Sequence, residues 1–130
     1  MNKISGPLLD RIDIHLTIPT VKYTELNDNT LGETSIEIRK RVNNARKIQL
    51  DRFKNDKIFS NSELSSKLIQ KYCKLDNESN LLMQQAFTKL NLSARAYGRV
   101  LKVARTIADL ENSENIKKIH LLEAIQYRTK

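Results

Sequence analysis

The sequence predicts an all-α fold, a helical bundle preceded by a short helix and a single strand. Apolar residues recur at helical spacing over residues 34–128, and residues of N-cap type stand ahead of four such stretches. The composition agrees, because 3 Gly and 2 Pro are too few for a turn-rich β-barrel. A chain of 130 residues has the length of one domain.

The first 19 residues differ from the rest. Ser5 can cap a short helix in which Pro7 suits the first turn, and residues 12–18 then alternate apolar and polar side chains, which predicts a strand. Because one strand cannot make a sheet, the chain is predicted to be a piece of something larger, and Met1 need not be its natural start. The side chains expected on one face of the strand are Ile12, Ile14, Leu16 and Ile18.

A polar connector rich in turn-forming residues is expected over residues 20–33. Thr34 and Glu37 then have the spacing of a capping box, which predicts a helix that runs to about Lys54. Arg52 is expected on the outer surface of this helix, away from its apolar face.

Four further helices are predicted. Ser60 repeats the capping-box spacing before the second helix, Asp76 can cap the third, and Ser93 can cap a fourth that ends near Leu110. The last helix is expected over about residues 117–128. The inner faces are expected to include Ile38, Val42 and Ala45, with Gln49 or Phe53, then Leu64, Leu68 and Ile69, then Leu82, Ala86, Phe87 and Leu90, then Tyr97, Val100, Leu101, Ala104, Ile107 and Ala108, and finally Leu121, Leu122, Ala124 and Ile125.

The charge is unevenly spread. Residues 1–33 hold three basic and five acidic residues, a net of −2, so residues 34–130 carry +10 of a chain whose net charge is +8. So basic a helical region would attract polyanions such as nucleic acid or nucleotide phosphate. A solvated, lysine-rich surface with no partner is an equally good interpretation.

A cytoplasmic protein with no membrane contact is expected. No apolar run approaches the 18 residues of a membrane span, and Asp10, Arg11 and Asp13 interrupt any signal-peptide core in residues 1–20. The single cysteine, Cys73, fits a reducing compartment.

Metal and nucleophile chemistry is not predicted. His15 and His120 lie far apart, and Cys73 has neither a metal-ligand spacing nor a recognisable base beside it. We expect no metal site, a buried Cys73 that acts as a small hydrophobe, and a His120 at the surface or in a helix cap.

No phosphate-binding loop of the form GxxxxGK[ST] is present, so the chain alone is not expected to hydrolyse ATP. Gly98 is expected inside the fourth helix, where Gly is unfavourable by about 1 kcal/mol relative to Ala. We interpret this glycine as allowing close approach of a neighbouring helix or a ligand.

Basic side chains open the fourth helix. Arg95 lies in its first turn, where a cation opposes the helix dipole, and Arg95, Arg99 and Lys102 form one stripe at i, i+4 and i+7. An anion beside Arg95 would explain this placement, and Arg99 and Lys102 are possible phosphate or DNA contacts. The alternative is that these are surface cations paired with acids such as Asp76 or Glu78.

Arg11 stands just before the predicted strand, between Asp10 and Asp13. From the residues alone, a simple salt bridge with a neighbouring acid is the favoured interpretation.

Three stretches of the sequence together resemble one family. They are residues 5–15 (SGPLLDRIDIH), residues 93–97 (SARAY) continuing to 105–110 (RTIADL), and residues 120–128 (HLLEAIQYR). In order and spacing they are similar to the C-terminal region of the magnesium-chelatase-like AAA+ ATPases, the ComM competence-protein group.

The resemblance implies an architecture. Residues 1–19 would be the end of the AAA+ core, residues 20–33 a connector, and residues 34–130 the helical lid. We therefore expect residues 34–130 to form a compact bundle, and residues 1–33 to be poorly ordered, to dock on the bundle or to pair with another copy.

The resemblance also implies residue roles. Arg11 matches the arginine finger and Arg95 the sensor-2 arginine of the lid, with ATP and Mg²⁺ as cofactors of the full-length parent and none in this chain alone. The implied partners are the protein's own N-terminal core, further copies in a homo-oligomeric ring, and DNA. The alternatives are the lid of a true magnesium-chelatase motor subunit and a free-standing, basic helical DNA-binding or interaction module.

Overall fold

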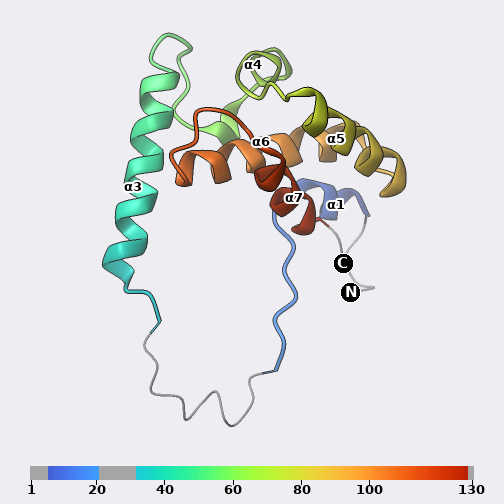
Figure 1. Cartoon of the computed structure of the whole chain (residues 1–130), viewed down its shortest axis with the longest axis horizontal. Helices are drawn as coiled ribbons and strands as arrows, with labels where there is room; N and C mark the ends of the chain where they lie inside the picture. The colour runs from blue at the N-terminus through green and yellow to red at the C-terminus, as the bar shows by residue number, and fades with distance from the viewer. Residues whose placement is uncertain (1–5, 21–31, 129–130) are drawn as a thin grey trace.

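The computed structural model describes residues 6–20 and 32–128, and all regular elements in these ranges are helical. Figure 1 shows their arrangement, with α6 at the centre. The predicted all-α fold is confirmed. The elements are α1 (Gly6–Arg11), α3 (Ser35–Arg52), the 3₁₀ turn η1 (Asn61–Glu63), α4 (Ser66–Tyr72), α5 (Asn77–Lys89), α6 (Ala94–Leu110) and α7 (Lys118–Gln126).

Local capping chemistry sets the helix starts. The hydroxyl of Thr34 accepts from the amide of Glu37, and the carboxylate of Asp76 and the hydroxyl of Ser93 each accept a backbone amide of the helix that follows. These three predicted caps are confirmed. The box at Ser60 caps only η1, and α4 begins later, after its own cap Ser65.

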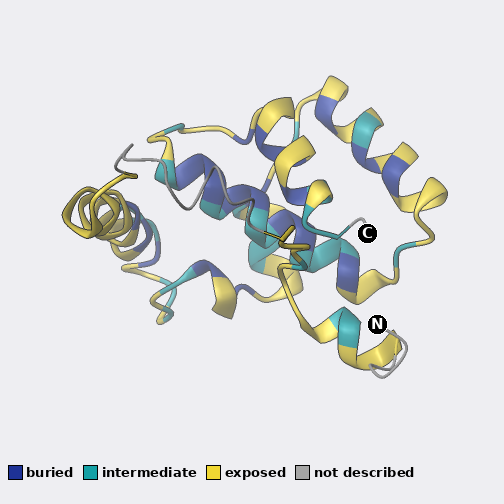
Figure 2. Ribbon diagram, turned by 90° about the horizontal axis from the view of Figure 1, so that it is seen from below, coloured by how far each residue is buried: buried dark blue, intermediate teal, exposed yellow. Residues whose placement is uncertain are grey.

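The core is built around α6. Its buried side chains include Val100, Leu101 and Ala104, and they pack with Phe53, which follows α3, and Leu121 of α7. Figure 2 shows this buried strip along α6 with exposed surfaces outside it. Every helix that precedes α6, apart from α5, contacts it at several positions, and α5 joins the core through α7.

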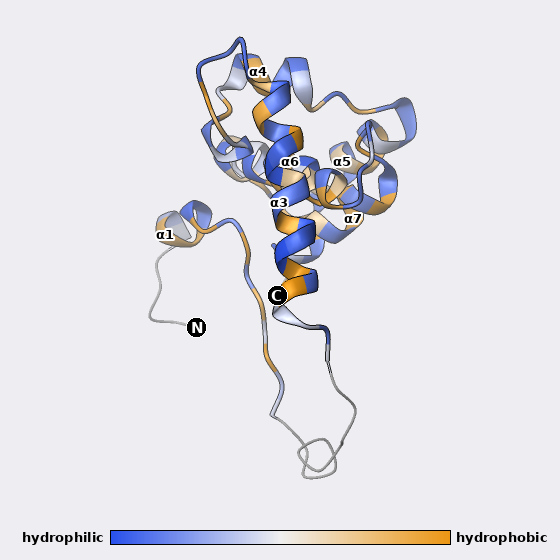
Figure 3. Cartoon of the chain, turned by 90° about the vertical axis from the view of Figure 1, so that its left-hand side faces the viewer, coloured by the Kyte–Doolittle hydropathy of each residue, from blue (hydrophilic) through white to orange (hydrophobic). Residues whose placement is uncertain are grey.

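The inner-face prediction for α3 is wrong in its first half. Ile38 and Val42 are 44% and 45% exposed, whereas Ala45 and Gln49 are buried. Only the C-terminal half of α3 packs on α6, and the N-terminal half projects from the bundle with hydrophobic residues on its surface (Figure 3). Elsewhere, Phe87, Leu90 and Leu122 are also exposed, against expectation.

The strand predicted over residues 12–18 is not formed. This segment has no regular structure, and Ile18 is 83% exposed, because no strand lies beside it in residues 6–20 or 32–128. It is tied to the bundle at Asp13, which pairs with Arg99, and at His15, whose amide donates to the carbonyl of Tyr127 at 2.7 Å. The expectations for Ser5 and for most of the 20–33 connector lie outside the described residues.

Candidate functional site

Polar contacts join α1 and the residues after it to the N-terminal part of α6. The hydroxyl of Ser93 donates to the carboxylate of Asp10 at 2.8 Å, and Arg99 forms an ion pair with Asp13. Arg128 donates to the carbonyls of Leu9 and Asp10, both at 3.0 Å, and so satisfies acceptors that the short helix α1 leaves open. These contacts hold the end of α1, with Arg11, beside the first turn of α6.

Arg11 is exposed and makes no hydrogen bond or ion pair within residues 6–20 and 32–128. The two neighbouring acids are engaged elsewhere, Asp10 by Ser93 and Asp13 by Arg99. The local salt bridge that the residues alone favoured is therefore not formed in this part of the chain. As far as residues 6–20 and 32–128 are concerned, the guanidinium of Arg11 is available to an external anion.

Arg95 is likewise exposed, in the first turn of α6, without a partner among the described side chains. The acids that could have paired with it do not, since Asp76 caps α5 and Glu78 bonds to Lys118 at 3.1 Å. The cation thus stands at the positive end of a helix dipole, where the carboxylate of Asp10 accepts from the cap residue Ser93 and does not pair with Arg95.

The other two members of the stripe have partners. Arg99 pairs with Asp13, and the ammonium of Lys102 donates to the carbonyl of Ser62 at 3.2 Å. Of the three cations predicted to act together, only Arg95 is left unpaired in the described part of the chain, and Arg99 and Lys102 help to place their neighbours.

A surface hollow of about 280 Å³ lies between α4 and α6, and it presents cations. Arg95, Arg99 and Lys102 contribute to its wall, and no Asp or Glu does. Such a set of groups can hold an anion, and guanidinium groups suit phosphate because their donors match two oxygens at once. The remaining lining residues are Leu64, Ser66, Ile69, Ala94 and Gly98.

The interpretation of Gly98 as a site of close helix packing is wrong. A Cβ atom added there would meet only Cδ1 of Ile69, at 3.7 Å, which is an ordinary van der Waals contact. Replacing Gly98 with Ala is therefore expected to raise the free energy of unfolding by about 0.5–1 kcal/mol, because Ala has the better helix propensity. Urea unfolding followed by circular dichroism measures this.

The matched control is Gly32→Ala. Gly32 also has open space around a Cβ but lies outside the helices, so a smaller gain is expected. A loss of stability in Gly98→Ala would show that the helix at this position does need glycine.

A buried polar network was missed by the sequence analysis. Asp109, fully buried, binds Arg52 through two contacts at 2.5 and 2.9 Å and Arg105 at 3.3 Å. It also accepts from the side-chain Nδ2 of Asn61 at 3.0 Å. The expected outward position of Arg52 is wrong, since its side chain is only 13% exposed. The network joins α3, η1 and α6 and so supports the helix that carries Arg95.

Burial lowers the pKa of Arg105, and the neighbouring charge of Asp109 opposes that effect. A visible signal for the network was the i, i+4 spacing of Arg105 and Asp109, since Asp109 is the one acidic residue within α6.

Cys73 is buried, as predicted, and its burial raises the thiol pKa to about 11, which disfavours the reactive thiolate. His120 is 1% exposed, so the surface alternative is wrong and the capping alternative is confirmed: its Nδ1 accepts from the amide of Lys117 at 2.9 Å. Across residues 6–20 and 32–128, no group of three His, Cys, Asp or Glu side chains is placed to hold a metal ion.

The helical bundle matches a family. The model of "Magnesium chelatase, subunit ChlI C-terminal" matches residues 32–128. The chain belongs to this ChlI C-terminal family. That assignment agrees with the predicted resemblance.

Individual relatives extend the similarity ahead of residue 32. The chain is 43% identical over 129 residues to the protein named Competence protein ComM of Haemophilus influenzae and 41% identical over 129 residues to YifB of Escherichia coli. It is 30% identical over 110 residues to Mb2921c of Mycobacterium bovis. The first two matches cover 98% of this chain and 25% of the relative, and the third covers 85% and 22%.

This ChlI C-terminal family chain thus spans about a quarter of the length of the curated relatives that it matches. Among the described residues, no helix is both long and apolar enough to traverse a bilayer.

Proposed function

We propose that this chain is the end of the core and the C-terminal lid of an oligomeric AAA+ ATPase of the magnesium-chelatase-like family, which acts on DNA in the cytoplasm. One observation carries the proposal. Arg11 and Arg95 are exposed and unpaired among the described residues, and they lie on two helices fastened together through Ser93 and Asp10.

The two arginines have different expected roles. Arg95, in the wall of the cationic hollow, would bind the phosphates of ATP in the ground state. Arg11 would stabilise the charge that develops during phosphoryl transfer, as an arginine finger does. The wall of the hollow fits the phosphates of ATP, because it has cations and no carboxylate. It offers no carboxylate to Mg²⁺, so ligands for that ion would come from the N-terminal core.

The proposed partners follow from what the chain lacks. It has no phosphate-binding loop, so the protein's own N-terminal core would supply the rest of the nucleotide site. A finger on a fixed helix would act on nucleotide bound by a neighbouring copy, which requires a homo-oligomer, expected to be a ring. DNA is favoured as the substrate by the basic charge, which attracts polyanions.

Two alternatives have specific support. The description of the matched family favours the lid of a magnesium-chelatase motor subunit. The net charge of +8 on a helical bundle also fits a free-standing DNA-binding module. The open reading frame discriminates between motor and module: for a motor it continues upstream and encodes GxxxxGK[ST].

Replacing Arg95 with Ala in the longer protein is expected to weaken ATP binding by about 10- to 100-fold, since a hydrogen bond to a charged group is worth about 1.5–3 kcal/mol. Fluorescence anisotropy of a labelled ATP analogue measures the dissociation constant. DNA-unwinding per ATP consumed is expected to fall as well.

The control is Arg39→Ala, an exposed arginine on α3 that lies outside the hollow. Equal affinities of the Arg95→Ala protein and the unchanged protein would remove Arg95 from the nucleotide site.

A further inference from the structure

Positive charge is concentrated in one stretch of the chain. Residues 39–74 contain eleven Lys and Arg against three Asp and Glu, a net of +8, which equals the net charge of the whole chain. This stretch covers most of α3, η1 and α4 and contains neither Arg11 nor Arg95.

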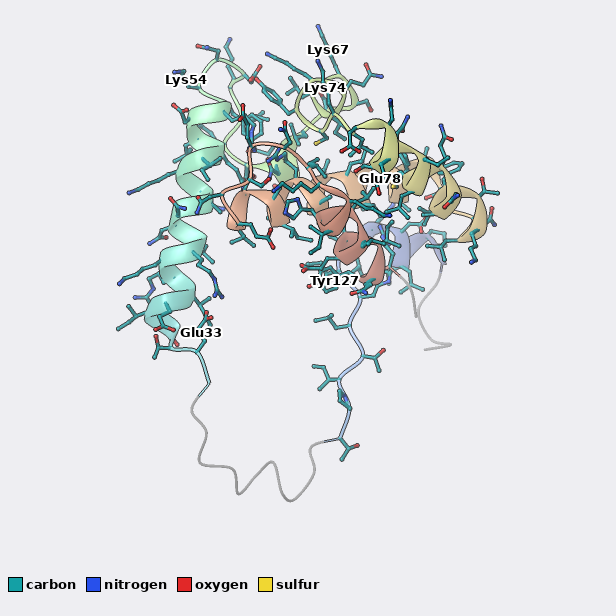
Figure 4. All side chains as sticks on the ribbon, viewed as in Figure 1. Glu33, Lys54, Lys67, Lys74, Glu78 and Tyr127 are labelled. Carbon is teal, nitrogen blue, oxygen red and sulfur yellow. The ribbon has the colours of Figure 1, made fainter. Side chains whose placement is uncertain are left out.

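The fold gathers several of these cations at one end of the molecule. Tyr72 of α4 donates its hydroxyl to the carboxylate of Asp56 at 2.5 Å, and its ring meets that of Phe53 edge-on at 5.3 Å. The loop after α3 and the helix α4 are thereby held together. Figure 4 shows Lys54, Lys67 and Lys74 projecting from this end. We call the set Lys54, Lys57, Lys67, Lys71 and Lys74 the lysine-rich end.

The acids of the same stretch offset only part of its charge, since three carboxylates stand against eleven Lys and Arg. Asp56 accepts from Tyr72 and its charge also acts on Lys71, and Glu63 accepts from the amides of Phe59 and Ser60 at 2.8 and 3.1 Å. Asp51 lies 3.8 Å from Lys54, a weak exposed contact. Lys57, Lys67 and Lys74 have no partner in the described part of the chain, so their mutual repulsion favours a polyanion.

An exposed aromatic side chain accompanies the lysines. Phe59 follows Lys57 in the loop and is 68% exposed, more than any other aromatic residue that the structure describes. Its amide is fixed by Glu63, so the ring is presented from an anchored backbone. A solvent-exposed ring beside cations suits stacking on a nucleic-acid base.

We propose that the lysine-rich end and Phe59 bind single-stranded DNA, with the lysines on the phosphates and the ring of Phe59 stacked on a base. The choice of DNA rests on the proposed function. Single-stranded DNA fits this site better than a duplex does. In a duplex each base is paired and stacked on its neighbours, so only an unpaired base can turn out and stack on a side chain. None of these residues lines the hollow that contains Arg95.

The first test measures phosphate contacts. A fluorescein-labelled single strand of about 16 nucleotides is titrated with the 130-residue chain at several salt concentrations. Lys57→Gln/Lys67→Gln/Lys74→Gln is expected to reduce the slope of log K against log salt by about 2, and the affinity at about 0.1 M salt by roughly 10- to 100-fold. The control Lys40→Gln/Lys89→Gln/Lys117→Gln removes the same charge elsewhere and should have a much smaller effect.

The second test measures stacking. Phe59→Ala is expected to weaken single-strand binding by about 5- to 100-fold with an unchanged salt slope, and Phe59→Trp to retain it. Leu81→Ala, at another exposed apolar residue, is the control. Circular dichroism melting confirms that each variant is folded.

Three results would overturn the proposal: no single-strand binding at about 50 mM salt, equal losses in the two lysine triples, or no effect of Phe59→Ala. The proposed ATPase function is tested separately, by the turnover and nucleotide affinity of the longer protein. If turnover and nucleotide affinity depend on Arg11 and Arg95 but the lysine-rich end does not bind single-stranded DNA, the proposed ATPase function is retained and the proposed DNA site is rejected.

Discussion

Replacement of Arg11 by Ala is expected to lower ATP turnover of the longer protein by about 1,000-fold or more while leaving nucleotide affinity nearly unchanged. The reason is that a finger meets charge that develops in the transition state, so its loss appears in kcat. Steady-state ATPase kinetics, with nucleotide affinity measured separately, make the distinction.

Arg11→Lys is not expected to restore turnover, because an ammonium lacks the planar fork of a guanidinium. Mixing Arg11→Ala subunits with subunits that cannot bind ATP should recover part of the activity if the finger acts on a neighbouring copy. Arg46→Ala, an exposed arginine on α3, provides the control. Normal turnover in Arg11→Ala would exclude a catalytic role for this residue.

The largest loss of stability is expected at Asp109. Asp109→Asn removes the charge but little volume, and it leaves Arg52 and Arg105 buried without a carboxylate. Removing one partner of a buried ion pair costs about 3–5 kcal/mol, a large part of the roughly 5–15 kcal/mol that stabilises a typical domain. Urea unfolding of the 130-residue chain measures the change.

Asp51→Asn is the matched control, because the side chain of Asp51 is 83% exposed and its contact with Lys54 is long. It should change the free energy of unfolding by less than about 0.5 kcal/mol. Replacing Arg105 and Asp109 together with Leu is expected to recover part of the lost stability, since apolar residues leave fewer charges buried. A change below about 1 kcal/mol in Asp109→Asn would contradict a structural role for the network.

The helix starts could be predicted because capping is local. Thr34, Asp76 and Ser93 each bond to an amide only three residues away, so the signal is contained in a few neighbouring letters of the sequence. The exposed half of α3 could not be predicted in this way. A helical pattern shows which side is apolar, but the length of the partner helix decides how much of that side is covered.

The candidate site was predictable in part. The position of Arg95 in a first turn follows from the cap at Ser93. Its lack of an acidic partner among the described residues could not be predicted, because it depends on Asp76 and Glu78 bonding elsewhere in three dimensions. The contact between Asp10 and Ser93 joins residues 83 positions apart, and the pair Arg52–Asp109 joins residues 57 apart. Rules based on spacing within a helix cannot predict contacts between residues so far apart in sequence. The expected role of Arg11 rests on the family resemblance alone.

The hydrogen bonds from Arg128 to the carbonyls of Leu9 and Asp10 have a mechanical consequence. Arg128 and Tyr127, just after α7, bond to the backbone of residues 9, 10 and 15. The position of α1 is therefore coupled to the C-terminal end of α7. If phosphate at Arg95 moved the lid relative to the core, as the proposed function implies, these contacts would have either to break or to carry Arg11 along with the lid.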